Sequence, residues 1–302
     1  MSIYTDRHGT QRWTCFATGA HGTAIDLVTT IRACTVRDAI DWLANHTNLT
    51  DHDAVVREAA SAVRPVGDPD AVLHTYIDAC QRWLWSPAGV GPRRWLQHGR
   101  HLPVDLARVN HLGFDPGRRH LDRPDGLPHG PGIVIPTLTE TGEAIYLQVR
   151  NLRPDARVKY TNPAGHIAAN PKLHWPHPAQ AVSGDTLYVC EGAIDALTIT
   201  NLGRRAVAIL SAAYTTPTVA AALARRPEHL ALALDNDPAG RAATAALLQH
   251  FRTARRTSRV TVIELPAGND LNALADQPEH LAGILDRADS RAPPFGRSGP
   301  SR

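Results

Sequence analysis

The most constraining feature of this 302-residue sequence is an alternation of short apolar segments and helical patterns in its last third. Apolar runs predict strands at 186–190, 206–210, 230–234 and 259–264. Helical patterns lie between and after them, at 193–202, 216–226, 238–255 and 278–287. Strands that alternate with helices form parallel βαβ units, so we predict a parallel sheet that helices cover on both faces.

Acidic residues follow three of these predicted strands. Glu191 comes directly after the first strand, and Asp235 and Asp237 come after the third. Asp270 follows the fourth strand and a short loop. Because ligands bind at the carboxyl ends of parallel strands, we expect these carboxylates to meet at one edge of the sheet. Hard oxygen ligands at this density suit Mg²⁺ or Mn²⁺.

Some of these acids also have a purely structural explanation. Asp235 and Asp237 could form a polar loop that caps the next helix, although a cap needs only one carboxylate. Asp195, four residues after Glu191 and on the same side of the predicted helix, is a candidate additional acid. It could equally be a first-turn acid that favours the helix dipole.

Basic residues are unevenly distributed, although the net charge is only +3. Residues 81–130 contain eight Arg and five His against four Asp and no Glu. This excess indicates a surface that faces phosphates, or else a solvated helical face. The chain has 32 Lys and Arg, of which only Lys159 and Lys172 are lysines, and their proximity in sequence hints at a specific phosphate contact.

Composition excludes several classes of protein. Hydrophobic residues make up 43% and charged residues 20%, which is typical of a globular chain. No apolar run approaches the roughly 18 residues that span a bilayer, and the start lacks the apolar core of a signal peptide, so we expect a cytoplasmic protein. The cysteines form no Cys-x-x-Cys pair, which predicts neither a disulfide framework nor an intact zinc site.

Four segments precede or follow the predicted parallel sheet. Residues 1–48 predict a hairpin, Ser2–Tyr4 with Arg12–Phe16, and then helices at 23–31 and 36–44. Residues 49–130 predict helices at 50–64, 70–85 and 92–110, the last broken near Gly99, and a Gly/Pro-rich loop from 115. Residues 131–185 predict a β-hairpin, 133–135 with 144–149, and then irregular structure with short strands. The Pro/Gly/Ser-rich tail 291–302 is predicted to be disordered.

The acidic motifs resemble those of the Toprim domain, which DnaG-type primases, topoisomerases and some nucleases share. They are Glu-Gly-Ala-Ile-Asp at 191–195, Asp-Asn-Asp-Pro-Ala-Gly-Arg at 235–241 and Pro-x-Gly-x-Asp at 266–270. Trp95–Gly99 and Leu112–Phe114 resemble the start of the primase catalytic core. Ile135–Arg150, Lys159–Asn162 and Lys172 resemble the primase stretch that leads into Toprim.

This resemblance implies a fold and a set of site residues. The fold is an α/β Toprim domain at 186–290, a parallel sheet flanked by helices, behind a mixed α+β primase-core-like region at 49–185. The implied metal ligands are Glu191, Asp235, Asp237 and Asp270. The implied phosphate-binding residues are Arg150, Lys159, Lys172 and Arg241.

The N-terminal segment resembles the second half of the primase zinc-binding module. The similar stretches are Gln11–Phe16, Gly19–Asp26 and Ala39–Ala44. The first half of the module, with its Cys and His ligands, does not precede them, and the remaining Cys-x-x-Cys pair is reduced to Cys15 and Thr18. One thiolate cannot hold a tetrahedral structural zinc, so we predict a vestigial module without zinc.

The resemblance implies primer synthesis on single-stranded DNA from nucleoside triphosphates, with Mg²⁺ or Mn²⁺ as cofactor. A Toprim nuclease, in which water is the nucleophile at the same metal site, is one alternative. A non-catalytic nucleic-acid-binding protein or replication adaptor is another. The sequence has no helicase-type P-loop, so any helicase partner is expected to be a separate chain.

Overall fold

The computed structural model describes residues 2–5, 11–14, 21–32, 34, 38–39, 42–43, 68–128, 130–153, 156, 158–182, 184–211, 215–226, 228–254, 259–266 and 269–290. Contacts divide the chain into two units, 1–65 and 66–302. The predictions for 50–64, for Cys15 and for the tail 291–302 lie outside the described residues. Among the helices that are described, none has the length and apolarity to span a membrane.

The first unit contains the predicted hairpin. Strand β1 (Ser2–Thr5) pairs antiparallel with β2 (Gln11–Thr14), which pairs with β3 (His21–Gly22). Helix α1 (Ala24–Arg32) follows. The Trp13 indole donates to the Thr23 carbonyl at 2.9 Å, and Asp26 accepts from the Thr23 N–H at 2.7 Å. These contacts fix the start of α1 against the sheet.

The second unit ends in the predicted parallel sheet, with strand order β11-β10-β8-β9. Its strands are β8 (Thr186–Cys190), β9 (Arg205–Ala208), β10 (His229–Ala233) and β11 (Val260–Val262), and all their pairings are parallel. Its helices are α7 (Ala193–Asn201), α8 (Pro217–Ala224), α9 (Pro238–Thr253) and α10 (Pro278–Asp289). The predicted α/β fold class is therefore confirmed.

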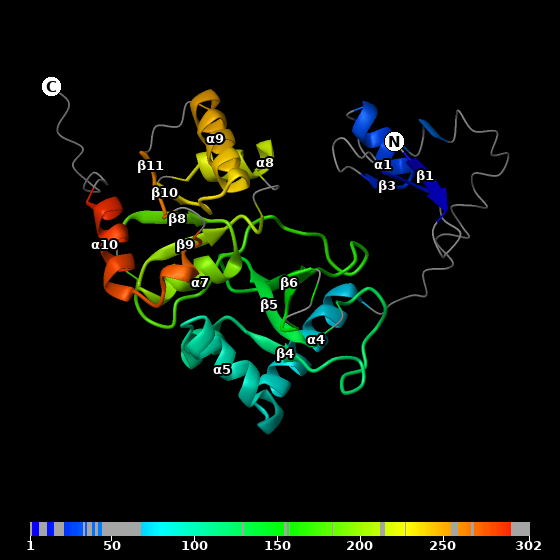
Figure 1. The fold of residues 1–302 in the computed structure, drawn as a ribbon, viewed down its shortest axis with the longest axis horizontal. Coiled ribbons are helices and arrows are strands. Elements are labelled where there is room, and N and C mark those ends of the chain that lie inside the picture. The colour runs from blue at the N-terminus through cyan, green and yellow to red at the C-terminus, as the bar shows by residue number, and fades with distance from the viewer. Residues whose placement is uncertain are drawn as a thin grey trace. The chain divides into compact units, whose positions relative to one another are not determined.

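Alternate side chains of the parallel sheet enter two different cores. Leu187, Val189, Leu230 and Leu232 pack against α8 and α9. On the other face the side chains are mostly smaller, including Cys190 and several alanines, and this face packs against α7 and α10. Figure 1 shows α8 and α9 on one side of this sheet and α7 on the other. A strand that is buried on both faces is a near-continuous apolar run, which explains why these strands could be predicted.

A second, antiparallel sheet has the order β4-β5-β6-β7. Its strands are β4 (Gly113–Asp115), β5 (Gly132–Leu138), β6 (Ala144–Asn151) and β7 (Tyr160–Thr161). The β5–β6 pair is the predicted hairpin, with Ile133 opposite Arg150. Strand β4 was not predicted, because its three residues adjoin the loop that the Gly/Pro-rich sequence indicated.

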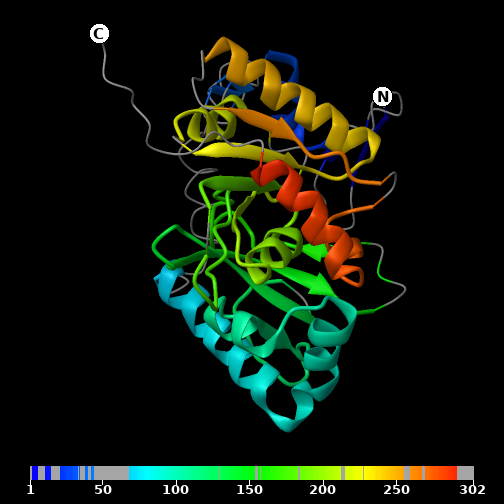
Figure 2. The same ribbon diagram turned by 90° about the vertical axis from the view of Figure 1, so that its left-hand side faces the viewer.

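Helices pack on both faces of the antiparallel sheet. Helix α4 (Pro69–Trp85) covers one face, where Leu73, Ile77 and Cys80 meet Val134 and Leu147. The predicted helix that breaks near Gly99 is present as two helices, α5 (Val90–Gly99) and α6 (Val104–Val109), which contribute to the core that contains α7. In Figure 2 the cyan helices α4 and α5 and the orange helix α9 lie at opposite ends of this unit, with the sheets between them.

His174 joins the two sheets. Its backbone N–H donates to the Ala208 carbonyl at 2.9 Å, and the Ala208 N–H donates back at 2.9 Å. Its Nδ1 accepts from the Leu138 N–H, at the end of β5, at 3.1 Å. The side chain is fully buried, and burial lowers the pKa of the imidazole from 6.5 to about 3. The ring is therefore neutral at physiological pH.

We predict that His174 lowers the free energy of unfolding as the pH is decreased from about 6.5 to about 3. In this range the unfolded chain binds a proton at His174 and the folded chain does not, so this group contributes a loss of about 1.4 kcal/mol per pH unit. His174→Leu removes the acceptor of the Leu138 N–H and should cost roughly 1–3 kcal/mol at pH 7. The variant should also lose part of the pH dependence.

Urea unfolding at pH 7 and pH 5 measures both effects. His280→Asn is the matched control, because His280 is exposed and does not act on His174. This control should keep the wild-type pH dependence. A His174→Leu variant whose free energy of unfolding changes with pH as the wild type does would contradict the assignment.

Candidate active site

The first acidic residue lies between β8 and α7. Strand β8 ends at Cys190, Glu191 and Gly192 form the turn, and α7 begins at Ala193. Glu191 lines a cleft of about 310 Å³ at the carboxyl end of the sheet, as predicted from its place after the strand. The short turn leaves the Glu191 carboxylate little freedom of position.

The loop 235–237 brings the next acids to the same edge. Asp237 caps α9, because its Oδ1 accepts from the Gly240 N–H at 2.8 Å. A side chain at position 240 would collide with the Asp235 carbonyl, since a Cβ there would lie 2.1 Å from that oxygen. Gly240 is therefore required for the loop to fold back on the helix, and this folding aims Asp235 into the cleft.

The segment around Asp270 closes the acidic edge. Asp270 lines the cleft, and its Oδ1 accepts from the Ala273 N–H at 2.6 Å. Asp195, on the first turn of α7, is buried and accepts from the Asn272 N–H at 3.0 Å. The loop after β11 is thus tied to α7 by a hydrogen bond between residues that are 77 positions apart.

The opposite wall of the cleft is basic and comes from the antiparallel sheet. Arg150 on β6 and Lys159 just before β7 both line the cleft, with Tyr160 beside them. The Arg150 guanidinium lies 5.2 Å from the centroid of the Tyr160 ring. Burial raises the pKa of Tyr160 to about 12, so its hydroxyl is neutral. The cleft therefore has carboxylates on one wall and cations on the other.

Burial and neighbouring negative charges raise the pKa values of two of these carboxyl groups, Asp195 and Asp235. Burial, followed by the charges of Asp270 and Asp235, raises the pKa of Asp195 to about 8. Burial, followed by the charges of Glu191 and Asp270, raises the pKa of Asp235 to about 7, and Lys159 opposes this shift. A bound cation would lower these pKa values, because a nearby positive charge favours the ionised carboxylate.

The donors at this edge fit a hard divalent cation that keeps part of its hydration shell. All the side-chain donors are carboxylate oxygens, and their mutual repulsion is what a cation would relieve. Within the described part of the chain, no group of three or more His, Cys, Asp or Glu side chains is arranged to hold a metal ion by itself. Mg²⁺ commonly binds through one or two carboxylates, with waters and substrate phosphates as its other ligands. Glu191 and Asp235 are the residues best placed for this role.

Three of the predicted site residues do not line the cleft. Asp237 is exposed and acts as the cap of α9, although its charge still acts on Asp235. Arg241 donates to the Asn236 side chain at 3.0 Å and so supports the loop. Lys172 has a left-handed backbone (φ 69°), and its N–H donates to Asn170 Oδ1 at 2.8 Å.

The sequence analysis did not single out several residues that line the cleft. These residues are Arg100, Gln148, Tyr160 and Asn272. Arg100 and Asn272 contact each other across 172 positions, so no local pattern could have paired them. Tyr160 follows Lys159 directly and lies in the stretch Lys159–Asn162 that resembles the primase segment, which was an available indication of its position.

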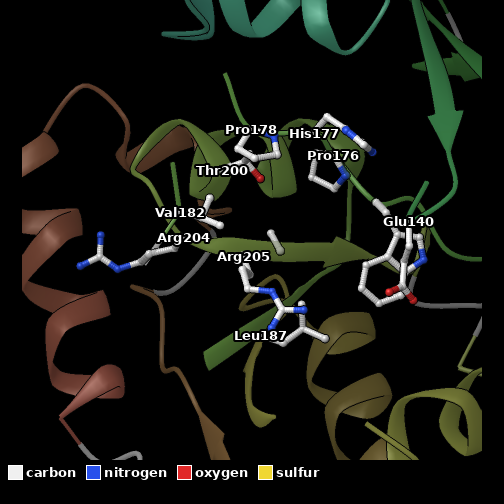
Figure 3. Close-up of a pocket in the computed structure, with 11 residues that line it drawn as sticks. Glu140, Pro176, His177, Pro178, Val182, Leu187, Thr200, Arg204 and Arg205 are labelled. Carbon is white, nitrogen blue, oxygen red and sulfur yellow. The ribbon is translucent and has the colours of Figure 1, made fainter. Parts of the chain in front are cut away.

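A second cavity, of about 160 Å³, opens near the start of β9 (Figure 3). It lies toward the amino end of that strand, whereas the carboxylates lie at the carboxyl ends. Its arginines already form ion pairs, Arg204 with Asp286 and Asp289, and Arg205 with Glu228. Its lining contains a single carboxylate, Glu140, which is itself paired with Arg226, so the cavity lacks the cluster of carboxylates that marks the first cleft.

Comparisons with known proteins identify a matching domain family and similar folds. Residues 188–275 match the family model described as Toprim-like. A search of curated proteins gives no match. Among solved structures, the Aquifex aeolicus primase with its zinc-binding and RNA polymerase domains is similar, with 18% identity and a TM-score of 0.57, over 93% of this chain and 73% of that one.

Two further solved structures have a similar fold over a smaller part of the chain. The RNA polymerase domain of Mycobacterium tuberculosis primase DnaG has 21% identity and a TM-score of 0.57, over 75% of this chain and 84% of that one. A DnaG primase catalytic domain bound to single-stranded DNA has 20% identity and a TM-score of 0.57, over 72% and 80%. The chain thus has a Toprim-like domain and the fold of the DnaG-type primase core, as predicted, and Toprim domains typically bind Mg²⁺.

We predict that Mn²⁺ or Mg²⁺ raises the melting temperature of the protein through Asp235. Asp235→Asn keeps the shape of the side chain but removes a charge, so metal affinity should fall about tenfold or more, which is about 1.4 kcal/mol. Without metal the variant should melt at or above the wild-type temperature, because a repulsive charge has gone. Thermal unfolding across a metal titration measures both effects.

Asp276→Asn serves as the control, because Asp276 is exposed and does not line the cleft. It should leave the metal-dependent shift unchanged. If Asp235→Asn and Asp276→Asn show the same shift as the wild type, Asp235 is not a metal ligand.

Proposed function

We propose that this chain, which has the fold of the DnaG-type primase catalytic core, is a metal-dependent nucleotidyltransferase that makes short primers on single-stranded DNA. The observation that carries this proposal is the cleft in which carboxylates of the Toprim-like domain face cations of the antiparallel sheet. A nucleotidyl transfer needs both groups, because a metal and a polyanionic substrate must be held together. One of the similar structures is a primase domain bound to single-stranded DNA.

The acidic wall would hold Mg²⁺ or Mn²⁺. We assign Glu191 and Asp235 as the principal ligands, with Asp237 and Asp270 as further ligands or charges and Asp195 as an additional buried acid. The bound metal would neutralise charge on the nucleoside triphosphate and make the attacking 3′-hydroxyl more acidic. The protein's own contribution is to fix Glu191 and Asp235 on short turns at neighbouring strand ends.

The basic wall would bind phosphates. Arg150 and Lys159 line the cleft opposite the carboxylates, so they can orient template or nucleotide phosphates toward the acidic wall. Stacking on Tyr160 limits the freedom of the Arg150 guanidinium, which reduces the entropy lost on binding. We also assign Lys172 and Arg241 to phosphate binding, outside the cleft. A separate helicase is a further proposed partner.

Incubation with single-stranded DNA, labelled nucleoside triphosphates and Mg²⁺ or Mn²⁺ tests the proposal. Growth of labelled chains, abolished by Asp235→Asn, is the expected result. Shortening of the DNA in place of growth would identify a nuclease that uses the same acids. Retention of DNA with neither change, in the wild type and in Asp235→Asn alike, would identify an adaptor.

We predict that Lys159 and Asp235 have separable roles. Lys159→Ala removes one phosphate contact, so affinity for single-stranded DNA should fall and the slope of log affinity against log salt should flatten by roughly 0.7. Asp235→Asn should abolish transfer and leave DNA affinity equal or slightly higher. Fluorescence anisotropy at several salt concentrations gives the affinities and slopes.

The control is Arg225→Ala, which removes an exposed cation at the end of α8, outside the cleft. It should keep the wild-type affinity and salt slope. Lys172→Ala then shows whether DNA contacts extend beyond the cleft. Wild-type binding by Lys159→Ala would refute the role of Lys159 while leaving the metal site intact.

A further inference from the structure

Arg100 lines the cleft from the corner between α5 and α6. Its guanidinium lies 4.9 Å from the centroid of the Trp95 ring, and its Nη1 donates to Asn272 Oδ1 at 3.0 Å. The residue is partly buried, and within the described residues it forms no ion pair. Its Nε is buried and has no acceptor among the residues that the structure describes.

This arrangement leaves a cation at the cleft without an anion. Moving a charged group out of water is unfavourable unless the group is paired and hydrogen-bonded. Asn272 and Trp95 satisfy only part of the guanidinium, which has five N–H donors. A phosphate group is an anion that a planar guanidinium binds with two parallel hydrogen bonds.

Asn272 fixes Arg100 relative to the acidic wall. It is buried, and its Nδ2 donates to the Arg100 carbonyl at 2.8 Å and to Thr198 Oγ1 at 2.9 Å. Its backbone N–H donates to Asp195. One residue therefore holds both the side chain and the backbone of Arg100, and links them to the helix that begins the acidic site.

We propose that Arg100 binds a phosphate group of the substrate in the cleft, with Asn272 as its positioning residue. The inference rests on the proposed function, because it requires a phosphate-bearing substrate. That phosphate can belong to a nucleoside triphosphate or to the DNA strand, and the chemistry of recognition is the same in both. The cleft then has three cations, Arg100, Arg150 and Lys159, facing its carboxylates.

The test compares full-length wild type with Arg100→Ala, Arg100→Lys and Arg108→Ala. Arg108 is the matched control, because its guanidinium also stacks on a tryptophan, 3.9 Å from the Trp85 centroid, but it is exposed and does not line the cleft. Each protein is titrated with ATP and Mg²⁺ by calorimetry, and with an oligo-dT strand by anisotropy at several salt concentrations. Melting curves identify any variant that does not fold.

Arg100→Ala should weaken binding roughly tenfold or more relative to Arg108→Ala, as expected for loss of a charged hydrogen-bonding partner. Arg100→Lys keeps the charge without the planar fork, so it should bind with intermediate affinity, and it replaces Arg100→Ala if the latter fails to fold. A loss confined to the ATP titration assigns the phosphate to the nucleotide. A loss of DNA affinity with a flatter salt slope assigns it to the strand, and neither change is expected from a merely structural residue.

Equal binding by Arg100→Ala and Arg108→Ala in both titrations would overturn the inference. If in that case the wild type extends chains and Asp235→Asn does not, the proposed function stands without Arg100. A wild type that binds neither ATP nor DNA would overturn both.

Discussion

The buried helix α7 is the element on which the rest of the second unit depends. Every residue from Ala193 to Thr200 is buried, so the helix must be covered on all sides. Small side chains of the parallel sheet, such as Ala206 and Ala231, lie in the same core and let the helix approach closely. Leu96 of α5 and Leu106 of α6, which precede the antiparallel sheet in the chain, also belong to that core. Packing around α7 therefore fixes the two walls of the cleft relative to each other.

Buried polar contacts add specificity to this packing. Arg123 and Asp115 form a buried ion pair, and Tyr76 donates to the same carboxylate at 2.7 Å. Desolvation offsets much of the attraction in such a pair, so its main effect is to fix the conformation of the loop 116–128. His174 has a comparable role between the two sheets, since a neutral ring satisfies the Leu138 N–H without introducing a charge.

The sequence predicted those helices and strands whose buried residues form a continuous or regularly spaced apolar pattern along the chain. The strand 186–190 and the start of α7 at 193 agree with the structure, because apolar runs and the turn at Gly192 set them. The carboxylates after the strands followed from the same topology. Strand β4 was missed because three residues carry no periodicity. Arg100 and Asn272 were missed because their contact depends on tertiary packing between distant segments.

The buried, mutually repelling carboxylates of the acidic wall lower the stability of the folded chain. Such a cost is expected of residues that are placed to bind a cation. The pKa of Asp195 is about 8 in the folded chain against an ordinary value of 3.8, so folding favours its protonated form. As pH rises from about 4 to 8, this group therefore lowers the free energy of unfolding. Helix caps and hydrogen bonds hold Asp237, Asp270 and Asp195 in place despite the repulsion. Since folding already holds these acids close together, a cation or a cationic side chain gains their attraction without the cost of assembling them.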